Sequence, residues 1–127
     1  FEGSGVLILG PSGSGKSSLA LELMTHGAQL VSDDRTVLHR IDGAIVASAP
    51  DAIKGQIEAR YVGILEARYA GPNRIDLVVD CATQETERLP PKRQIKLLGE
   101  SLALIHNSET RPLAAAIVQY VRGARSA

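Results

Sequence analysis

A stretch of eight residues near the start of the chain places the strongest constraint on its fold. Gly10 to Ser17 has the sequence GPSGSGKS, which satisfies the pattern G-x-x-x-x-G-K-[ST] of a phosphate-binding loop. The stretch follows a wholly apolar run, Val6 to Leu9, and precedes a segment, Lys16 to Thr25, with apolar side chains at helical spacing. Because a buried strand, a glycine-rich turn and a helix follow in this order, the context favours phosphate binding over an ordinary turn.

The residues of this loop have distinct expected roles. Gly13 and Gly15 allow the backbone to curl so that its N–H groups converge on phosphate oxygens. Lys16 is expected to reach the terminal phosphates, and the Ser17 hydroxyl is suited to bind Mg²⁺. The sequence therefore predicts a nucleotide site formed by Gly10, Pro11, Ser12, Gly13, Ser14, Gly15, Lys16 and Ser17.

The rest of the sequence favours a single α/β domain over residues 1–127. Hydrophobic residues make up 44% of the chain and aromatic residues only 3%, so we expect a core of Leu, Ile, Val and Ala. Residues 50–62 allow no clean assignment, although 57–62 alternate as in a strand, and the abrupt start at Phe1 suggests sequence upstream. Strands are predicted at Ala28–Val31, Thr36–His39, Ala44–Ala47, Ile75–Val79 and Leu102–Ile105, a polar loop at Thr83–Arg93, and a helix at Pro112–Val121.

Charge and composition argue against several classes of partner. Fourteen basic residues cancel fourteen acidic ones, so no broad field favours nucleic acid or an anionic membrane. No apolar run approaches the roughly 18 residues of a membrane span, and no leader precedes the first strand. The single cysteine, Cys81, is compatible with a reducing compartment and is expected to be a small buried hydrophobic residue. We therefore expect a soluble cytoplasmic protein.

Phosphoryl transfer also needs carboxylates near the metal and the attacking hydroxyl, and the sequence offers three. Asp33 and Asp34 follow a predicted strand. In a regular strand only one of the two carboxylates would face the site, whereas at a strand end both could. The alternative interpretation is that the two aspartates belong to a solvated turn without a function. Glu58 offers another oxygen ligand, with Arg60 on the same strand face, but a surface ion pair fits these two residues equally well.

The remaining charged residues carry weaker signals. Arg88 and Arg111 lie beside loop signals and could stabilise charge on a transferring phosphoryl group, although loop arginines are usually solvated. His26, His39 and His106 show no metal-ligand spacing. The histidines therefore give no strong indication of function.

Taken in order, these segments resemble the C-terminal catalytic domain of the HPr kinase/phosphorylase family, in the shortened form of some proteobacteria. The resemblance covers nearly the whole chain. It rests on Gly10–Ser17, on Leu30-Val-Ser-Asp-Asp34, and on Ile57-Glu-Ala-Arg-Tyr-Val-Gly-Ile-Leu65, a modified form of the family signature I-E-[IV]-R-G-[LI]-G-[IL]. Shorter and weaker matches are Glu87-Arg-Leu89 and Thr110-Arg-Pro-Leu113.

The resemblance implies a fold and a set of residue roles. The implied fold is a phosphate-loop domain with a mixed sheet, similar to the nucleotide-binding core of phosphoenolpyruvate carboxykinase. Lys16 would act in the catalytic loop and Asp34 would be the base for phosphorylation and the acid for its reversal, supported by Asp33. The other implied roles are Ser17 and Glu58 as metal ligands, Arg88 as the active-site arginine, and Ile105–Arg111, which includes Arg111, as the segment used in dephosphorylation.

The implied activity is transfer of phosphate from ATP, with Mg²⁺, to a serine of the small carrier protein HPr. Reversal would use inorganic phosphate and release pyrophosphate, and the family regulates the phosphotransferase system and carbon metabolism as homohexamers. The chain departs from the family pattern at Ser18, Ala28 and Tyr61, where Tyr61 replaces a signature glycine. These departures suggest one alternative hypothesis, a nucleotide-binding regulatory module without catalysis. A small-molecule kinase is the other, because a phosphate loop does not determine which hydroxyl attacks.

Overall fold

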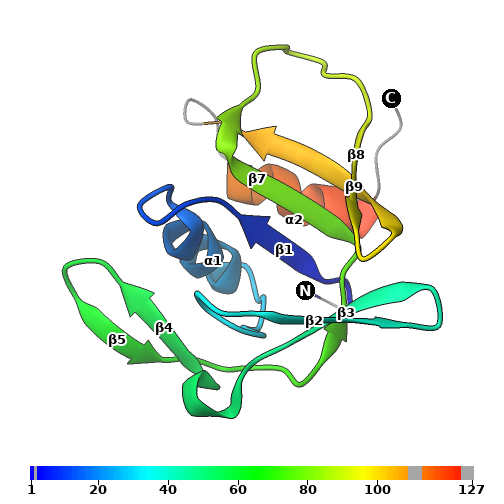
Figure 1. Ribbon diagram of the computed structural model, residues 1–127. Coiled ribbons are helices and arrows are strands. Elements are labelled where there is room, and N and C mark those ends of the chain that lie inside the picture. Colours follow the sequence, from blue (N-terminus) through cyan, green and yellow to red (C-terminus); the bar gives the residue numbers. More distant parts are fainter. Residues whose placement is uncertain (2, 109–112, 124–127) are drawn as a thin grey trace.

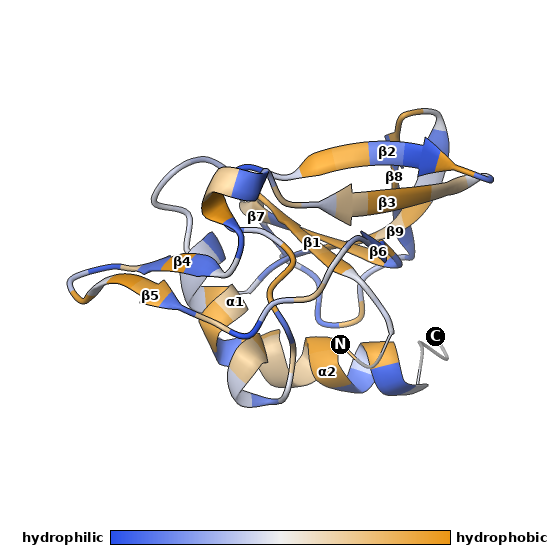
Figure 2. Ribbon diagram, turned by 90° about the horizontal axis from the view of Figure 1, so that it is seen from below, coloured by the Kyte–Doolittle hydropathy of each residue, from blue (hydrophilic) through white to orange (hydrophobic). Residues whose placement is uncertain are grey.

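The chain folds into three layers with a four-stranded sheet in the middle (Figures 1 and 2). The structure is a computed structural model that describes residue 1, residues 3–108 and residues 113–123. Its elements are β1 (Val6–Leu9), α1 (Lys16–Thr25), β2 (Val37–Ile41), β3 (Ala44–Ser48), the 3-10 helix η1 (Asp51–Ile53), β4 (Gln56–Ala59), β5 (Gly63–Glu66), β6 (Asn73–Arg74), β7 (Leu77–Gln84), β8 (Arg93–Leu97), β9 (Glu100–Asn107) and α2 (Leu113–Gly123).

The central sheet has the strand order β1-β7-β9-β8. β1, β7 and β9 are parallel, and β8 pairs antiparallel with β9, so the sheet is mixed, as predicted. In β7, Leu77, Val78 and Val79 are all fully buried. Because successive strand residues point to opposite faces, Leu77 and Val79 pack toward the helices while Val78 packs toward the other side. An apolar run covered on both faces is typical of a parallel sheet.

The two faces of the central sheet are covered by different elements. Helices α1 and α2 pack on one face, and the small antiparallel sheet β2-β3-β6 packs on the other, as Figure 2 shows. The buried side chains of the described residues between them are aliphatic apart from Cys81, in agreement with the low aromatic content. On the helix side the buried core comprises Leu19, Leu23, Leu77, Val79, Cys81, Ala114, Ile117 and Val118, and on the other side Leu7, Ile45, Ala47, Ile75 and Val78.

A third, two-stranded sheet stands apart from the other two. Its strands β4 and β5 pair antiparallel and form a hairpin that extends away from the central sheet in both views (Figures 1 and 2). Ile57 and Ala59 are buried on one face of β4, while Gln56 and Glu58 on the other face are exposed. The unassigned stretch 50–62 thus contains η1, β4 and the turn that leads into β5, and the strand-like part of it ends at Ala59.

Several predicted elements are confirmed. β1 and α1 flank the glycine-rich loop, and β2 and β3 form the predicted hairpin, in which Asp42 and Gly43 adopt φ angles of 50° and 76°. Helix α2 begins at Leu113 in the described residues, whereas Pro112 lies outside them. Neither helix in the described ranges is long and apolar enough to cross a membrane.

Other predicted boundaries are wrong. Ala28–Val31 is not a strand, because its pairing is limited to a single bridge between Leu30 and Tyr69. β7 does not end before Asp80 but continues to Gln84. The predicted loop 83–93 therefore shortens to residues 85–92 between β7 and β8, and β8 (Arg93–Leu97) was missed.

Candidate phosphate-transfer site

The glycine-rich loop joins the carboxyl end of β1 to the start of α1. Gly15 caps the helix at φ 92°, a left-handed conformation that glycine adopts without steric cost. Gly10 is needed for a different reason, since a Cβ atom there would lie 2.6 Å from Ser14 Oγ and 3.2 Å from Cys81 Cβ. The first turn of a helix leaves its N–H groups without partners inside the helix. The loop therefore offers backbone donors and the positive end of the α1 dipole to an anion.

Asp33 connects this loop to the β4–β5 hairpin. Its Oδ1 accepts a hydrogen bond from Ser17 Oγ at 2.9 Å, and its Oδ2 accepts one from the backbone N–H of Glu58, also at 2.9 Å. Asp33 thereby holds three segments together. The role implied for Asp33 by the family resemblance, support of Asp34 as the base, stays a prediction.

One cavity collects most of the predicted site residues. It has a volume of about 570 Å³ and runs from the glycine-rich loop along α1. Its polar end is the candidate site, and its other end is lined by apolar side chains that include Leu23 and Val118. The described residues at the polar end are Ser12, Gly13, Gly15, Lys16, Ser17, Ser18, Asp33, Asp34, Glu58 and Arg60.

Asp34 lies beside Asp33 in this cavity and is exposed. Its φ angle of 61° is in the left-handed region, which aspartate tolerates better than most residues. The backbone of this segment is therefore not extended through the doublet, and both carboxylate residues line the cavity. Among the described residues, Asp34 makes no ion pair with a neighbouring side chain.

Arg60 is a cavity residue that the sequence predictions did not select. Its Nη2 atom lies 3.8 Å from the position that a Cβ atom on Gly13 would take, so the guanidinium reaches the glycine-rich loop. The signal was present in the sequence, because Arg60 follows Glu58 by two residues and faces the same way. Arg60 and Lys16 place two cations at the polar end of the cavity.

The two predicted arginines are not among the described residues that line the cavity, for different reasons. Arg88 is exposed in the loop between β7 and β8 and is not among the described residues that line it. Its catalytic role stays a prediction. Arg111 lies outside the described residues, as does most of the predicted segment Thr110–Leu113.

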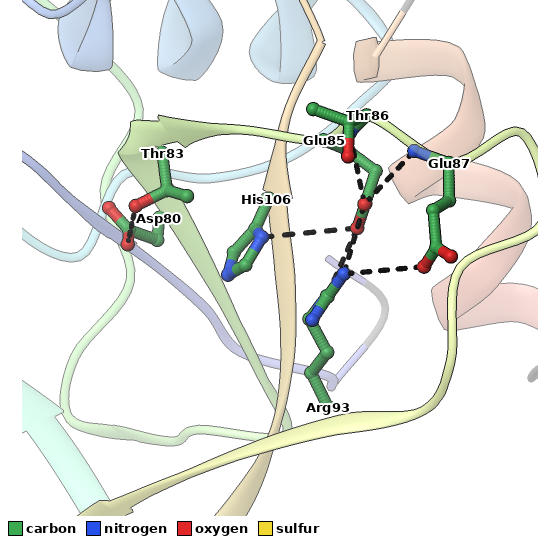
Figure 3. Close-up of polar contacts among 7 residues, drawn as sticks. All are labelled: Asp80, Thr83, Glu85, Thr86, Glu87, Arg93 and His106. Atoms are coloured by element: carbon green, nitrogen blue, oxygen red, sulfur yellow. Dashed lines mark hydrogen bonds and ion pairs between the residues drawn. The ribbon is translucent and has the colours of Figure 1, made fainter.

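The loop that carries Arg88 is closed at its base by an ion pair (Figure 3). Arg93 donates from Nε to Glu85 Oε1 at 3.1 Å and from Nη2 to Glu85 Oε2 at 3.0 Å. His106 Nδ1 lies 3.9 Å from Glu85 Oε1, and Arg93 Nη2 lies 3.8 Å from Glu87 Oε2. Hydrogen bonds from the Arg93 guanidinium lower the pKa of the Glu85 carboxyl below its usual range.

Cys81 lies beneath the glycine-rich loop and is buried, as predicted. Burial raises the pKa of its thiol, the nearby Asp80 carboxylate raises it further, and the Lys16 ammonium opposes the shift. Because the thiolate is the reactive form, Cys81 is suited to packing and not to nucleophilic chemistry.

The donor set at the polar end fits a magnesium ion bound together with a nucleotide. The described residues contain no group of three His, Cys, Asp or Glu side chains that could hold a metal ion alone. Magnesium, however, is usually bound by one or two carboxylates together with substrate phosphates and water. The hydroxyl of Ser17 and the carboxylate of Asp33 supply adjacent oxygen atoms beside the loop, and Glu58 lines the same cavity.

Comparison with known sequences identifies relatives of this chain. The sequence model of the family described as HPr Serine kinase C-terminal domain matches residues 1–98. The HPr kinase/phosphorylase of Lachnoclostridium phytofermentans is 35% identical over 123 residues, which cover 87% of this chain and 40% of that protein. The corresponding protein of Caldicellulosiruptor bescii is 40% identical over 110 residues, which cover 76% of this chain and 35% of that protein. The chain thus spans well under half the length of these curated relatives.

A solved structure has the same fold. The structure of the Hpr(Ser) kinase/phosphatase from Coxiella burnetii superposes with a TM-score of 0.78 and 26% sequence identity. The match covers 94% of this chain and 86% of that chain. The similarity therefore extends over nearly the whole chain.

Proposed function

This chain belongs to the HPr serine kinase C-terminal domain family, and from that premise we propose that it transfers the γ-phosphoryl group of ATP to a serine of an HPr-type carrier protein. The observation that best supports the proposal is the contact between the loop residue Ser17 and Asp33, with Asp34 next to it in one cavity. The site thus combines a phosphate loop, oxygen ligands and a carboxylate that can accept a proton. The names of the relatives favour this activity over a small-molecule kinase or a module without catalysis.

In the forward direction the residues of the cavity have separate tasks. Lys16 and the loop N–H groups hold the terminal phosphates, and Arg60 is placed to offset charge on the transferring group. Asp34 accepts the proton as the serine oxygen attacks phosphorus and the bond to the β-phosphate oxygen breaks. Asp33 keeps the Ser17 hydroxyl in position. Ser17 and Glu58 would hold Mg²⁺, which when bound draws charge from the phosphate oxygens.

The reverse reaction uses the same groups. Inorganic phosphate attacks the phosphorus of phosphoserine, and protonated Asp34 returns its proton to the leaving serine oxygen, so that pyrophosphate and free serine are formed. The phosphorylase part of the proposal is supported by the names of the relatives. The segment Ile105–Arg111 is proposed to assist the reverse reaction, and Arg88 is proposed as the active-site arginine.

The wider biological role is also part of the proposal. By similarity to its relatives the protein would control the phosphotransferase system and carbon metabolism from the cytoplasm. A homo-oligomer, a hexamer by family resemblance, is proposed as the working form. Sedimentation would reveal it as a species several times heavier than the 13.5 kDa chain.

The test is phosphoryl transfer to purified HPr with labelled ATP and Mg²⁺, with mass spectrometry to identify the modified residue. We expect label on one serine. Asp34→Asn should lower kcat at least about 100-fold, because a positioned base contributes 10²–10⁴-fold. Asp42→Asn is a matched control, since Asp42 is also exposed, has a φ of 50° and lies outside the cavity. If the parent protein leaves HPr unlabelled, or labels a residue other than serine, the proposal is wrong.

A further inference from the structure

A second hollow adjoins the candidate site on the side of the β4–β5 hairpin. It has a volume of about 300 Å³. It shares Asp33, Asp34 and Glu58 with the larger cavity, but Lys16 and Ser17 line only the larger one. The residues around the second hollow are Asp33, Asp34, Arg35, Ile53, Gln56, Ile57, Glu58 and Ile64.

The two hollows therefore meet at the carboxylates. In phosphoryl transfer the attacking and leaving oxygens lie roughly in line with phosphorus between them. The leaving side belongs to the larger cavity, because that cavity contains the phosphate loop. The second hollow gives the attacking hydroxyl a separate approach to Asp34.

The wall of the second hollow continues into an exposed apolar surface on the hairpin. Ile64 lies directly across from Glu58 in the β4–β5 register and is 64% exposed. Val62 is 73% exposed and Tyr61 is 100% exposed at the turn of the hairpin. Tyr61, Val62 and Ile64 follow one another along the turn and the start of β5, interrupted only by Gly63, and we name these three exposed residues the hairpin rim.

The turn of this hairpin also contains a strained residue. Tyr61 has a φ angle of 68°, which is unfavourable for an aromatic residue. Its fully exposed side chain gains nothing from packing within the chain. Strain without internal compensation is typical of functional surfaces.

We propose that the hairpin rim is the docking surface for the acceptor protein, with Val62 and Ile64 in contact with an apolar patch next to its serine. This inference rests on the proposed function, because it assumes that the acceptor is a protein. The size of the surface favours that occupant, since a small metabolite would fill the hollow without reaching Val62 or Tyr61, neither of which lines it. The contact is apolar because these exposed side chains carry no charge.

Steady-state kinetics with HPr as the varied substrate test the proposal. Ile64→Ser and Val62→Ser should each raise the KM for HPr by about three- to tenfold, since each removes apolar area that docking would bury. Ile41→Ser is the matched control, because Ile41 is 52% exposed on β2 and lines neither hollow. The Kd for ATP, measured by calorimetry, should be the same in the two rim variants as in the parent.

The outcomes separate this inference from the proposed function. Label transfer by the parent, with KM raised in both rim variants but not in Ile41→Ser, supports docking at the hairpin rim. Label transfer with an unchanged KM in both rim variants overturns it and leaves the kinase assignment intact. A rim variant that also loses ATP affinity counts against docking, because the substitution then disturbs the site itself. Absence of transfer by the parent removes the kinase assignment and this inference together.

Discussion

At the scale of single residues, the aspartate doublet works because the chain is not a regular strand at that point. Side chains of neighbouring strand residues point to opposite faces, so a strand through the doublet would remove one carboxylate from the site. The left-handed φ of Asp34 avoids this, and both residues line the cavity. The sequence allowed either outcome. Which of the two arrangements forms depends on the long-range contacts of Asp33 with Ser17 and Glu58. A local sequence pattern does not predict such contacts.

Tyr61 gives a test of backbone strain at one residue. The related family has glycine at this position, and the φ of 68° provides the physical reason, because a Cβ atom is disfavoured in that region. We predict that Tyr61→Gly has a higher free energy of unfolding than Tyr61→Ala by about 0.5–1 kcal/mol, despite the greater flexibility of glycine in the unfolded chain. Urea denaturation of the two variants measures the difference.

The comparison with alanine is the control for loss of the aromatic ring. Both variants lack the phenol, so only the Cβ atom separates them. Since the Tyr61 side chain is fully exposed, neither variant leaves a cavity in the core. Equal stability of the two, or greater stability of the alanine variant, would show that this turn is not strained.

At the scale of secondary structure, the sequence predicted an element correctly where the local pattern of residues is strong. The loop with its flanking strand and helix was predictable, since turn chemistry and periodicity agree there. β8 was missed although its pattern is predictable. Gln94 and Lys96 alternate with Ile95 and Leu97 as in a half-buried strand. Leu30 shows the opposite case. Its apolar neighbours favour a strand, but only the distant Tyr69 is available as a bridge partner.

The ion pair that closes the β7–β8 loop makes stability depend on pH. The Arg93 guanidinium lowers the pKa of the Glu85 carboxyl from its ordinary value of 4.5. A lowered carboxyl pKa in the folded state means that the contribution to stability is complete above the unfolded value and is lost as the pH falls through the folded one. We predict that the difference in unfolding free energy between the parent and Glu85→Gln is constant near neutral pH and shrinks below about pH 4.5.

Chemical denaturation at several pH values from 3 to 7 measures this difference. Glu22→Gln is the control, because Glu22 is exposed on α1 and makes no ion pair with another described residue. Its difference from the parent should vary less with pH than that of Glu85→Gln. A parent and a Glu85→Gln variant that lose stability in parallel on acidification would contradict the role given to the Arg93 contact.

At the scale of the whole molecule, the central sheet determines where the site can form. β1 and β7 are parallel, with Leu9 opposite Asp80, so the glycine-rich loop emerges at the carboxyl edge of the sheet. Ligands bind at this edge in open α/β sheets. The sequence predicted the loop and the carboxylates separately. Their convergence required the β4–β5 hairpin to fold back beside α1, which only the three-dimensional structure shows.

Because the site is assembled from segments distant in sequence, nucleotide binding should stabilise the fold as a whole. A ligand that binds only the folded state adds about 2.7 kcal/mol to the unfolding free energy at one hundred times its Kd. For a domain of this size that corresponds to a rise in Tm of about 10 °C. We predict such a rise for the parent with ATP and Mg²⁺, and a much smaller one for Lys16→Ala, measured by thermal unfolding. Lys96→Ala, which removes an exposed lysine outside the cavity, should behave as the parent does. If Lys16→Ala gains as much stability as the parent, the nucleotide phosphates are not held by the glycine-rich loop.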